Sequence, residues 1–107
     1  MASSYEPGEV ARRLSADDLV VIDVRDRDEW RDAQVEGASH LPLDELDQRS
    51  DELPHDRPIA FICRTGKRSE TAAERAAEQG LNAGNVTGGI EAWAKAGLPV
   101  RPGDAAA

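Results

Sequence analysis

The sequence has few of the residues that cross-link a chain through disulfides or metal ions, and it lacks long apolar runs that would anchor it in a bilayer. Its 107 residues include one cysteine, one methionine, one phenylalanine and one tyrosine. A single cysteine forms no internal disulfide, and it cannot by itself build a cysteine-rich zinc site. No apolar run approaches the ~20 residues that cross a bilayer. The composition argues against a disulfide scaffold and a membrane span, and we expect no metal and no cofactor.

Positive charge is also scarce. The chain has 13 lysines and arginines against 21 aspartates and glutamates, which gives a net charge of −8 at pH 7. Such a chain repels nucleic acid and anionic membrane surfaces, so neither is an expected partner. Residues 1–6 lack the basic start and the apolar stretch of a signal peptide, which favours a cytoplasmic location.

The length and the hydrophobic pattern predict one α/β domain over 1–107, with a core from about residue 5 to 100 and a loose tail at 101–107. Apolar and β-branched runs predict strands at 19–24, 38–41, 58–63 and 85–87. Helical spacing predicts helices at 7–14, 27–33 and 68–79, and a fourth between Gly89 and Gly97. Strands that alternate with helices indicate a mostly parallel sheet covered on both sides. No heptad pattern points to assembly, so a monomer is expected.

The residues that carry chemistry gather in the loop after the strand at 58–63. This loop reads Cys63, Arg64, Thr65, Gly66, Lys67, Arg68 and Ser69. Gly66 allows the loop to curl, so that successive amide N–H groups point inward and form an anion-binding nest. The helix that follows adds the positive end of its dipole at the same point. Together with three basic side chains, these features are expected to lower the pKa of Cys63 and favour the reactive thiolate.

A thiolate in an anion cradle predicts covalent transfer, with Cys63 as the nucleophile. The expected substrate-binding residues are the five that follow it, Arg64, Thr65, Gly66, Lys67 and Arg68. The cradle suits a small sulfur-bearing anion such as thiosulfate, whose outer sulfur the thiolate attacks while sulfite leaves. The resulting persulfide passes its sulfur to cyanide or to a thiol, by steps like those of thiol–disulfide exchange.

Three other interpretations of the same residues stay open. A free cysteine often only fills a core, in which case the basic side chains solvate an ordinary loop. In a sulfur relay or binding module, Cys63 would receive sulfur from a partner protein and pass it on. Cysteine-dependent phosphatases use a cysteine, five residues and an arginine that clamps phosphate bidentately. Here that position is Ser69 and Arg68 falls one residue early, which disfavours a phosphatase.

Four motifs, in order along the chain, resemble those of the rhodanese homology family. They are Asp-Val-Arg at 23–25 before Glu-Trp at 29–30, Gly-Ala at 37–38 before His-Leu-Pro at 40–42, the loop that begins at Cys63, and Gly-Gly-Ile-Glu-Ala-Trp at 88–93 before Gly-Leu-Pro-Val at 97–100. The resemblance implies a three-layer α/β/α fold around a five-stranded parallel sheet. It implies Cys63 as nucleophile and persulfide carrier, with the amides from Arg64 to Arg68 around the bound sulfur.

The length and charge of the loop refine what the resemblance implies. A six-residue loop is typical of the sulfurtransferases rather than of the related cell-cycle phosphatases. The cationic side chains look more like those of thiosulfate users than of mercaptopyruvate users. One departure is Ala-Gln-Val at 33–35, where many relatives have Gly-His-Ile. That histidine is generally structural, so the change bears on local packing.

Four other polar residues are not expected to be catalytic. The histidines, His40 and His55, are not needed as bases when the thiolate is already formed. Asp23 and Arg25 are expected to form an ion pair or hydrogen-bond network that supports the loop.

Overall fold

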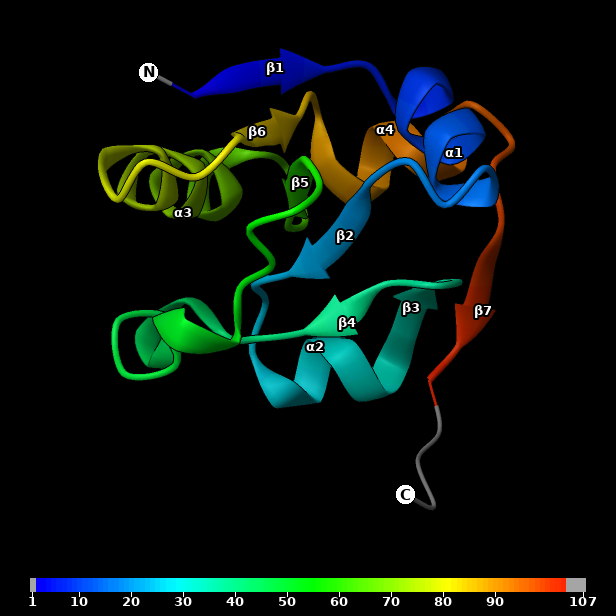
Figure 1. Ribbon diagram of the computed structural model, residues 1–107. Coiled ribbons are helices and arrows are strands. Elements are labelled where there is room, and N and C mark those ends of the chain that lie inside the picture. The colour runs from blue at the N-terminus through cyan, green and yellow to red at the C-terminus, as the bar shows by residue number, and fades with distance from the viewer. Residues whose placement is uncertain (1, 104–107) are drawn as a thin grey trace.

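A computed structural model describes residues 2–103 of the chain (Figure 1). Its strands are β1 (Ser3–Tyr5), β2 (Val20–Asp23), β3 (Ala33–Val35), β4 (Ser39–His40), β5 (Ile59–Ile62), β6 (Ala83–Val86) and β7 (Val100–Pro102). Its helices are α1 (Pro7–Ser15), α2 (Arg27–Asp32), α3 (Lys67–Glu78) and α4 (Gly89–Lys95). Two short 3-10 helices, Leu43–Glu45 and Ser50–Glu52, follow β4.

Five strands form a parallel sheet in the order β1-β6-β5-β2-β4. The adjacent strands β2 and β5 are in register from Val20 opposite Ile59 to Asp23 opposite Ile62. Every residue of β5 is buried, as expected for a parallel strand that is covered on both faces. The predicted α/β class and the five-stranded parallel sheet are confirmed.

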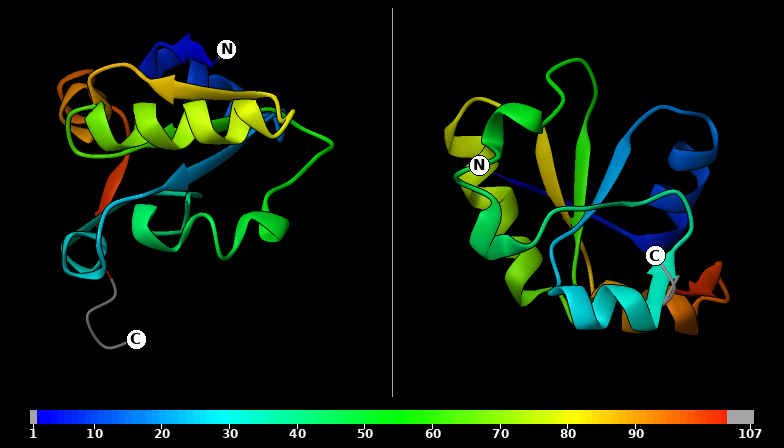
Figure 2. Two further views of the ribbon diagram at one scale, coloured as in Figure 1. Left: turned by 90° about the vertical axis from the view of Figure 1, so that its left-hand side faces the viewer. Right: turned by 90° about the horizontal axis from the view of Figure 1, so that it is seen from below.

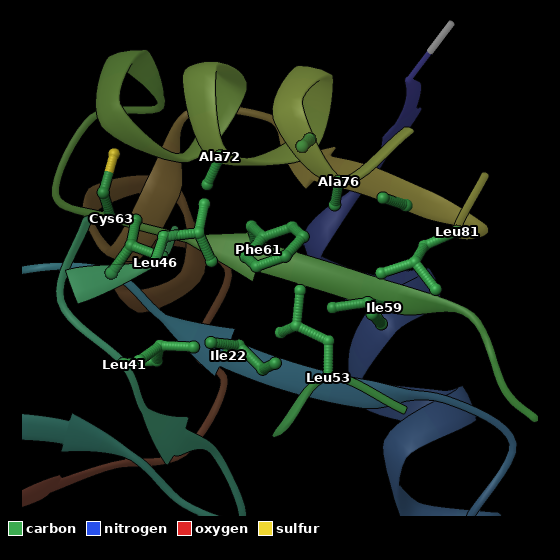
Figure 3. Packing of buried hydrophobic residues seen from close by; sticks show 13 residues of the cluster. Ile22, Leu41, Leu46, Leu53, Ile59, Phe61, Cys63, Ala72, Ala76 and Leu81 are labelled. Atoms are coloured by element: carbon green, nitrogen blue, oxygen red, sulfur yellow. The ribbon is translucent and has the colours of Figure 1, made fainter. Parts of the chain in front are cut away.

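Alternate residues of the sheet face opposite layers of helices. Ile59 and Phe61 belong to a buried cluster that includes alanines of α3, while Ala60 and Ile62 belong to a second that includes residues of α1 and α4. Figures 1 and 2 show α3 on one side of the sheet and α1 and α4 on the other. Cys63 continues the alternation of Ile59 and Phe61, so its side chain lies in the α3 layer (Figure 3).

Helix α3 lies close to the sheet because its buried face carries only small side chains. These are Ser69, Ala72, Ala73 and Ala76. The close approach brings the first turn of α3 over the end of β5, where Cys63 stands. None of the helices within residues 2–103 is long and apolar enough to cross a bilayer.

Strand pairing extends beyond the expected core of about 5 to 100 at both ends. Strand β1 pairs with β6 from Ser3 onward, so ordered structure begins before residue 5. Strand β7 pairs with β3 in a second, antiparallel sheet, so Arg101 and Pro102 are not a loose tail. The Arg101 guanidinium donates to the Gln34 side-chain oxygen over 3.0 Å, which adds a side-chain contact to the backbone pairing. The rest of the predicted tail, 104–107, lies outside the described residues.

Candidate active site

The segment 63–69 comprises the connection from β5 to α3, residues 63–66, and the first residues of α3. Gly66 caps α3 with a φ of 113°, a conformation that residues with a side chain rarely adopt. The helix therefore begins at Lys67, and the amides of its first turn have no partner inside the helix. The curled loop predicted from Gly66 is present, at the positive end of the dipole of a 12-residue helix.

Hydrogen-bond donors surround the sulfur of Cys63. The Gly66 amide nitrogen lies 3.1 Å from Sγ, the Ser69 amide nitrogen 3.4 Å and the Ser69 hydroxyl 3.3 Å. Burial raises the pKa of Cys63, but these donors, with the amide of Thr65, outweigh burial and hold the pKa below its ordinary value. The predicted direction is thus found, with hydrogen bonds rather than the loop's basic side chains as its main cause.

Ser69 was not predicted as a site residue, yet its hydroxyl lies between the Cys63 sulfur and the side-chain oxygen of Asn85. A hydroxyl carries one proton, so it donates either to the sulfur or to Asn85, and a negative sulfur favours the first. The signal for Ser69 was available in the sequence. It is the polar member of an otherwise alanine-lined buried face, and a buried hydroxyl needs a partner.

The start of α4 fixes the direction of the loop's peptide groups. The Ile90 amide donates to the Cys63 carbonyl over 2.8 Å, and the next amide of α4 donates to the Arg64 carbonyl over 3.1 Å. The approach is so close that a methyl group on Gly89 would collide with both carbonyl groups. Carbonyl and N–H point in opposite directions across a trans peptide, so the Thr65 amide points away from α4 and toward the sulfur.

Both arginines of the loop are paired with carboxylates. Arg68 makes two contacts with Glu29 of α2, Nη1 to Oε1 at 2.6 Å and Nη2 to Oε2 at 2.9 Å. Arg64 makes one, from Nε to Oε2 of Glu91 at 3.1 Å. Within residues 2–103 the exposed Lys67 has no ion pair. The three cations stand at the loop as predicted, but two of them are neutralised by partners that were not foreseen.

Comparison with known proteins decides the family. A family model described as Rhodanese-like domain matches residues 6–96. The chain belongs to the rhodanese-like domain family.

Three similar proteins match this chain over most of their own length. A protein named sulfurtransferase from Allochromatium vinosum is 32% identical over 102 residues, which are 94% of this chain and 95% of the relative. Thiosulfate sulfurtransferase GlpE of Actinobacillus succinogenes is 34% identical over 81% of this chain and 79% of the relative. The crystal structure of a rhodanese-related protein from Thermoplasma volcanium has a TM-score of 0.86 and 30% identity, over 92% of this chain and 97% of that one. These likenesses support sulfur transfer as the general chemistry and a transferase as the class.

At the end of β2, the rhodanese-like domain has the ion pair expected of Asp23 and Arg25. Both residues are buried, and Nη2 of Arg25 lies 2.8 Å from Oδ2 of Asp23 and 2.6 Å from the Ala33 carbonyl oxygen. The Arg25 carbonyl in turn lies 2.7 Å from Nε2 of His40, whose ring stacks on Trp30 at 4.7 Å between centroids. This network ties β2, α2, β3 and β4 together. The predicted ion pair is therefore present, while its support of the Cys63 loop stays a prediction.

The departure at 33–35 from the usual rhodanese pattern is accommodated. Gln34 is buried with 4% of its surface exposed, and its side-chain oxygen accepts the bond from Arg101 of β7. A buried amide that is satisfied in this way costs little. The position therefore serves to hold β7 against β3.

Two surface hollows flank the loop that begins at Cys63. One, of about 390 Å³, is lined by Val24, Asp26, Pro42, Leu43, Asp44, Arg68 and Arg75. The other, of about 480 Å³, is lined by Arg25, Glu29, Asp32, Ala33, Arg64, Ile90, Glu91 and Ala94. Each hollow thus contains one arginine of the loop. Among residues 2–103, no group of three or more His, Cys, Asp or Glu side chains is placed to hold a metal ion.

Proposed function

We propose that this chain is a thiosulfate sulfurtransferase that carries sulfane sulfur as a persulfide on Cys63. The observation that carries the proposal is the set of donors on the Cys63 sulfur, two amides and a hydroxyl at the start of α3. A thiolate held in this way is nucleophilic without a general base. The acceptor of the sulfur is cyanide or a thiol.

In the first half-reaction, the Cys63 thiolate attacks the outer sulfur of thiosulfate. A bond forms between Sγ and that sulfur, the sulfur–sulfur bond of thiosulfate breaks, and sulfite leaves with its electron pair. The amides from Arg64 to Arg68 hold the transferred sulfur, because those in the first turn of α3 have no partner inside the helix. Since Cys63 is only 1% exposed, a small donor is favoured over a bulky one.

In the second half-reaction, cyanide or a thiolate attacks the outer sulfur of the persulfide. A bond forms between the acceptor and that sulfur, the persulfide bond breaks, and Cys63 leaves as a thiolate. A thiol with a lowered pKa is the better leaving group. The donors that lower the pKa of Cys63 therefore assist both half-reactions.

Steady-state kinetics with thiosulfate and cyanide test this proposal. Transfer through a covalent intermediate predicts ping-pong kinetics, with parallel double-reciprocal lines at different fixed cyanide concentrations. The Cys63→Ser variant is expected to form no thiocyanate and to keep the circular dichroism spectrum of the wild type. Intersecting lines, or turnover by Cys63→Ser, would contradict the proposal.

A relay that takes sulfur from a partner protein is the second candidate. The observation in its favour is the pairing of Arg64 with Glu91 and of Arg68 with Glu29, which leaves neither arginine free for the charge of thiosulfate. Slow turnover with thiosulfate, combined with rapid loading of Cys63 from a persulfidated protein, would favour the relay over the thiosulfate enzyme.

A phosphatase has less support from the geometry. In the phosphatase pattern of a cysteine, five residues and an arginine, the arginine position is occupied here by Ser69, whose hydroxyl donates to the sulfur. The nearby Arg68 is bound by Glu29. An arginine that clamps phosphate over the nucleophile is therefore not in place. Hydrolysis of an aryl phosphate that disappears in Cys63→Ser would be needed to restore this function.

A further inference from the structure

The ion pair of Arg68 and Glu29 takes no part in the sulfur-transfer steps. Its two parallel contacts, 2.6 and 2.9 Å, form the forked arrangement with which arginine holds a carboxylate or another planar or tetrahedral oxyanion. Arg68 stands in the first turn of α3, next to Ser69, whose hydroxyl touches the nucleophile. The guanidinium is thus a formed oxyanion site on the residue before Ser69, and it is occupied by a carboxylate of the same chain.

Glu29 is held in this place by its own helix. Its amide donates to Oδ1 of Asp26 over 3.0 Å, and its Oε1 accepts from the Asp26 amide over 3.3 Å, which together form the capping box of α2. The hydrogen bond from Arg68 is the largest cause that lowers the pKa of Glu29, to about 2. Glu29 therefore remains charged at any pH at which sulfur transfer would be assayed.

The pair is open to exchange with an anion from solution. Arg68 exposes 37% of its side-chain surface and Glu29 exposes 28%. The pKa of Arg68 is raised first by the hydrogen bond to Glu29 and also, to a lesser degree, by the negative charge of Cys63.

We propose that Glu29 competes with anionic sulfur donors for Arg68 and so sets the affinity of the site for them. A sulfonate-type group, such as that of thiosulfate, gains the two guanidinium N–H bonds only by displacing the Glu29 carboxylate. No covalent bond changes in this exchange, and Glu29 keeps the Asp26 amide as its partner. The inference rests on the proposed function, because it concerns donor binding at that same site.

The substitution Glu29→Gln removes the carboxylate that competes for Arg68 and is expected to leave the fold unchanged. Glutamine serves at this position of a capping box as glutamate does, so α2 is expected to keep its start. Removing the competing charge should lower KM for thiosulfate about five- to tenfold, the scale of a charge-assisted hydrogen bond that is partly exposed to water. The value of kcat should change less than about twofold, since no group on the reacting sulfur is altered.

Two matched variants separate competition from a general effect of charge. Glu52→Gln removes one negative charge from another two-contact pair, in which Arg49 meets Glu52 at 2.9 and 2.9 Å, and it should leave KM unchanged. In the double variant Glu29→Gln, Arg68→Gln, the gain in affinity should disappear, because the site for the anion is gone. A fall in KM that persists in the double variant, or an equal fall in Glu52→Gln, would overturn the inference.

Sulfate binding separates this inference from the proposed function. Sulfate carries the same charge as thiosulfate but lacks the outer sulfur atom that is transferred. Its binding therefore reports the anion site alone, and its dissociation constant can be measured by calorimetry in a Cys63→Ser background. Glu29→Gln in that background should bind sulfate about five- to tenfold more tightly than Cys63→Ser alone. If Glu29→Gln binds sulfate more tightly but no variant that retains Cys63 turns over thiosulfate, the inference holds and the proposed sulfurtransferase function is refuted. Unchanged sulfate binding beside normal ping-pong turnover would refute the inference alone.

Discussion

Two turns from strand to helix stand at the same edge of the sheet, and they differ in what their amides bind. Strands β5 and β6 are parallel neighbours, and each runs into a helix capped by a left-handed glycine, Gly66 with φ of 113° and Gly88 with φ of 75°. The amides at the turn from β5 to α3 face the Cys63 sulfur. The amides at the turn from β6 to α4 bind the carbonyl groups of Cys63 and Arg64. The same local geometry thus makes a cradle at one turn and a support for that cradle at the other.

The role of each strand-to-helix turn is therefore decided by the acceptor that its amides bind, and not by the geometry of the turn itself. A helix start offers free amides to whatever acceptor lies opposite. At α3 the acceptor is a thiol that becomes charged, and its pKa falls as a result. At α4 the acceptors are neutral carbonyls, and the bonds to them orient the neighbouring loop.

The largest expected effect comes from breaking the supporting turn with Gly89→Ala. The added methyl group would collide with the carbonyl groups of Cys63 and Arg64 and force the loop to move. We expect turnover to fall roughly 10²-fold, as for a misplaced reactive group, and the free energy of unfolding to fall by ~2 kcal/mol. Urea titration and thiocyanate formation measure the two effects.

Gly97→Ala is the matched control for that variant. Gly97 also has a positive φ, 76°, but a methyl group there meets open space. It should lose about 1 kcal/mol of stability through backbone strain and keep near-normal turnover. Equal losses of activity in the two variants would show that the contact with the loop's carbonyls is unimportant.

A smaller effect is expected from Ser69→Ala, which removes one donor from the cradle itself. The pKa of Cys63 lies below its ordinary value partly because of this hydroxyl, so the loss of the hydroxyl should raise the pKa. The thiolate fraction near neutral pH then falls, and the midpoint of the rate against pH moves to higher pH. Ultraviolet titration of the thiolate reads the pKa directly.

Thr71→Ala is the control for the loss of a hydroxyl from the same helix. The Thr71 hydroxyl is exposed and lies 3.4 Å from the Lys67 carbonyl oxygen, away from the sulfur. It should leave the titration of Cys63 unchanged. A pKa in Ser69→Ala that equals the pKa in Thr71→Ala would contradict the role given to Ser69.

The smallest effect is expected from Lys67→Ala. Lys67 is exposed and forms no ion pair within residues 2–103, so it acts on an anionic donor only through screened charge. KM for thiosulfate should rise about two- to threefold with kcat unchanged, the range of an exposed charge pair. The exposed Lys95, near the end of α4, gives the comparison, since Lys95→Ala should leave KM unaltered.

Local patterns predicted most of the fold and the centre of the site. The apolar runs at 19–24 and 58–63 predicted the two adjacent buried strands, because burial on both faces leaves a continuous apolar segment. The order strand, Cys63, Gly66 and helix predicted the cradle, since its geometry depends only on consecutive residues. The three-residue strands β1 and β7 escaped prediction because segments so short carry no periodic pattern.

Contacts between distant segments account for what was missed at the site. Arg68 and Glu29 are 39 positions apart, and Arg64 and Glu91 are 27 apart. A basic residue in the sequence shows its charge but not the carboxylate that the fold brings to it. The motifs at 29–30 and 88–93 therefore indicated segments that contact the Cys63 loop. Which residues make those contacts became evident only from the structure.

The intact mass of the protein, before and after incubation with thiosulfate, tests the central claim most directly. The wild type should gain the mass of one sulfur atom, lose it again on addition of cyanide, and Cys63→Ser should gain nothing. A wild type that gains no sulfur, or a Cys63→Ser variant that gains as much, would contradict a persulfide on Cys63 as the carrier of the reaction.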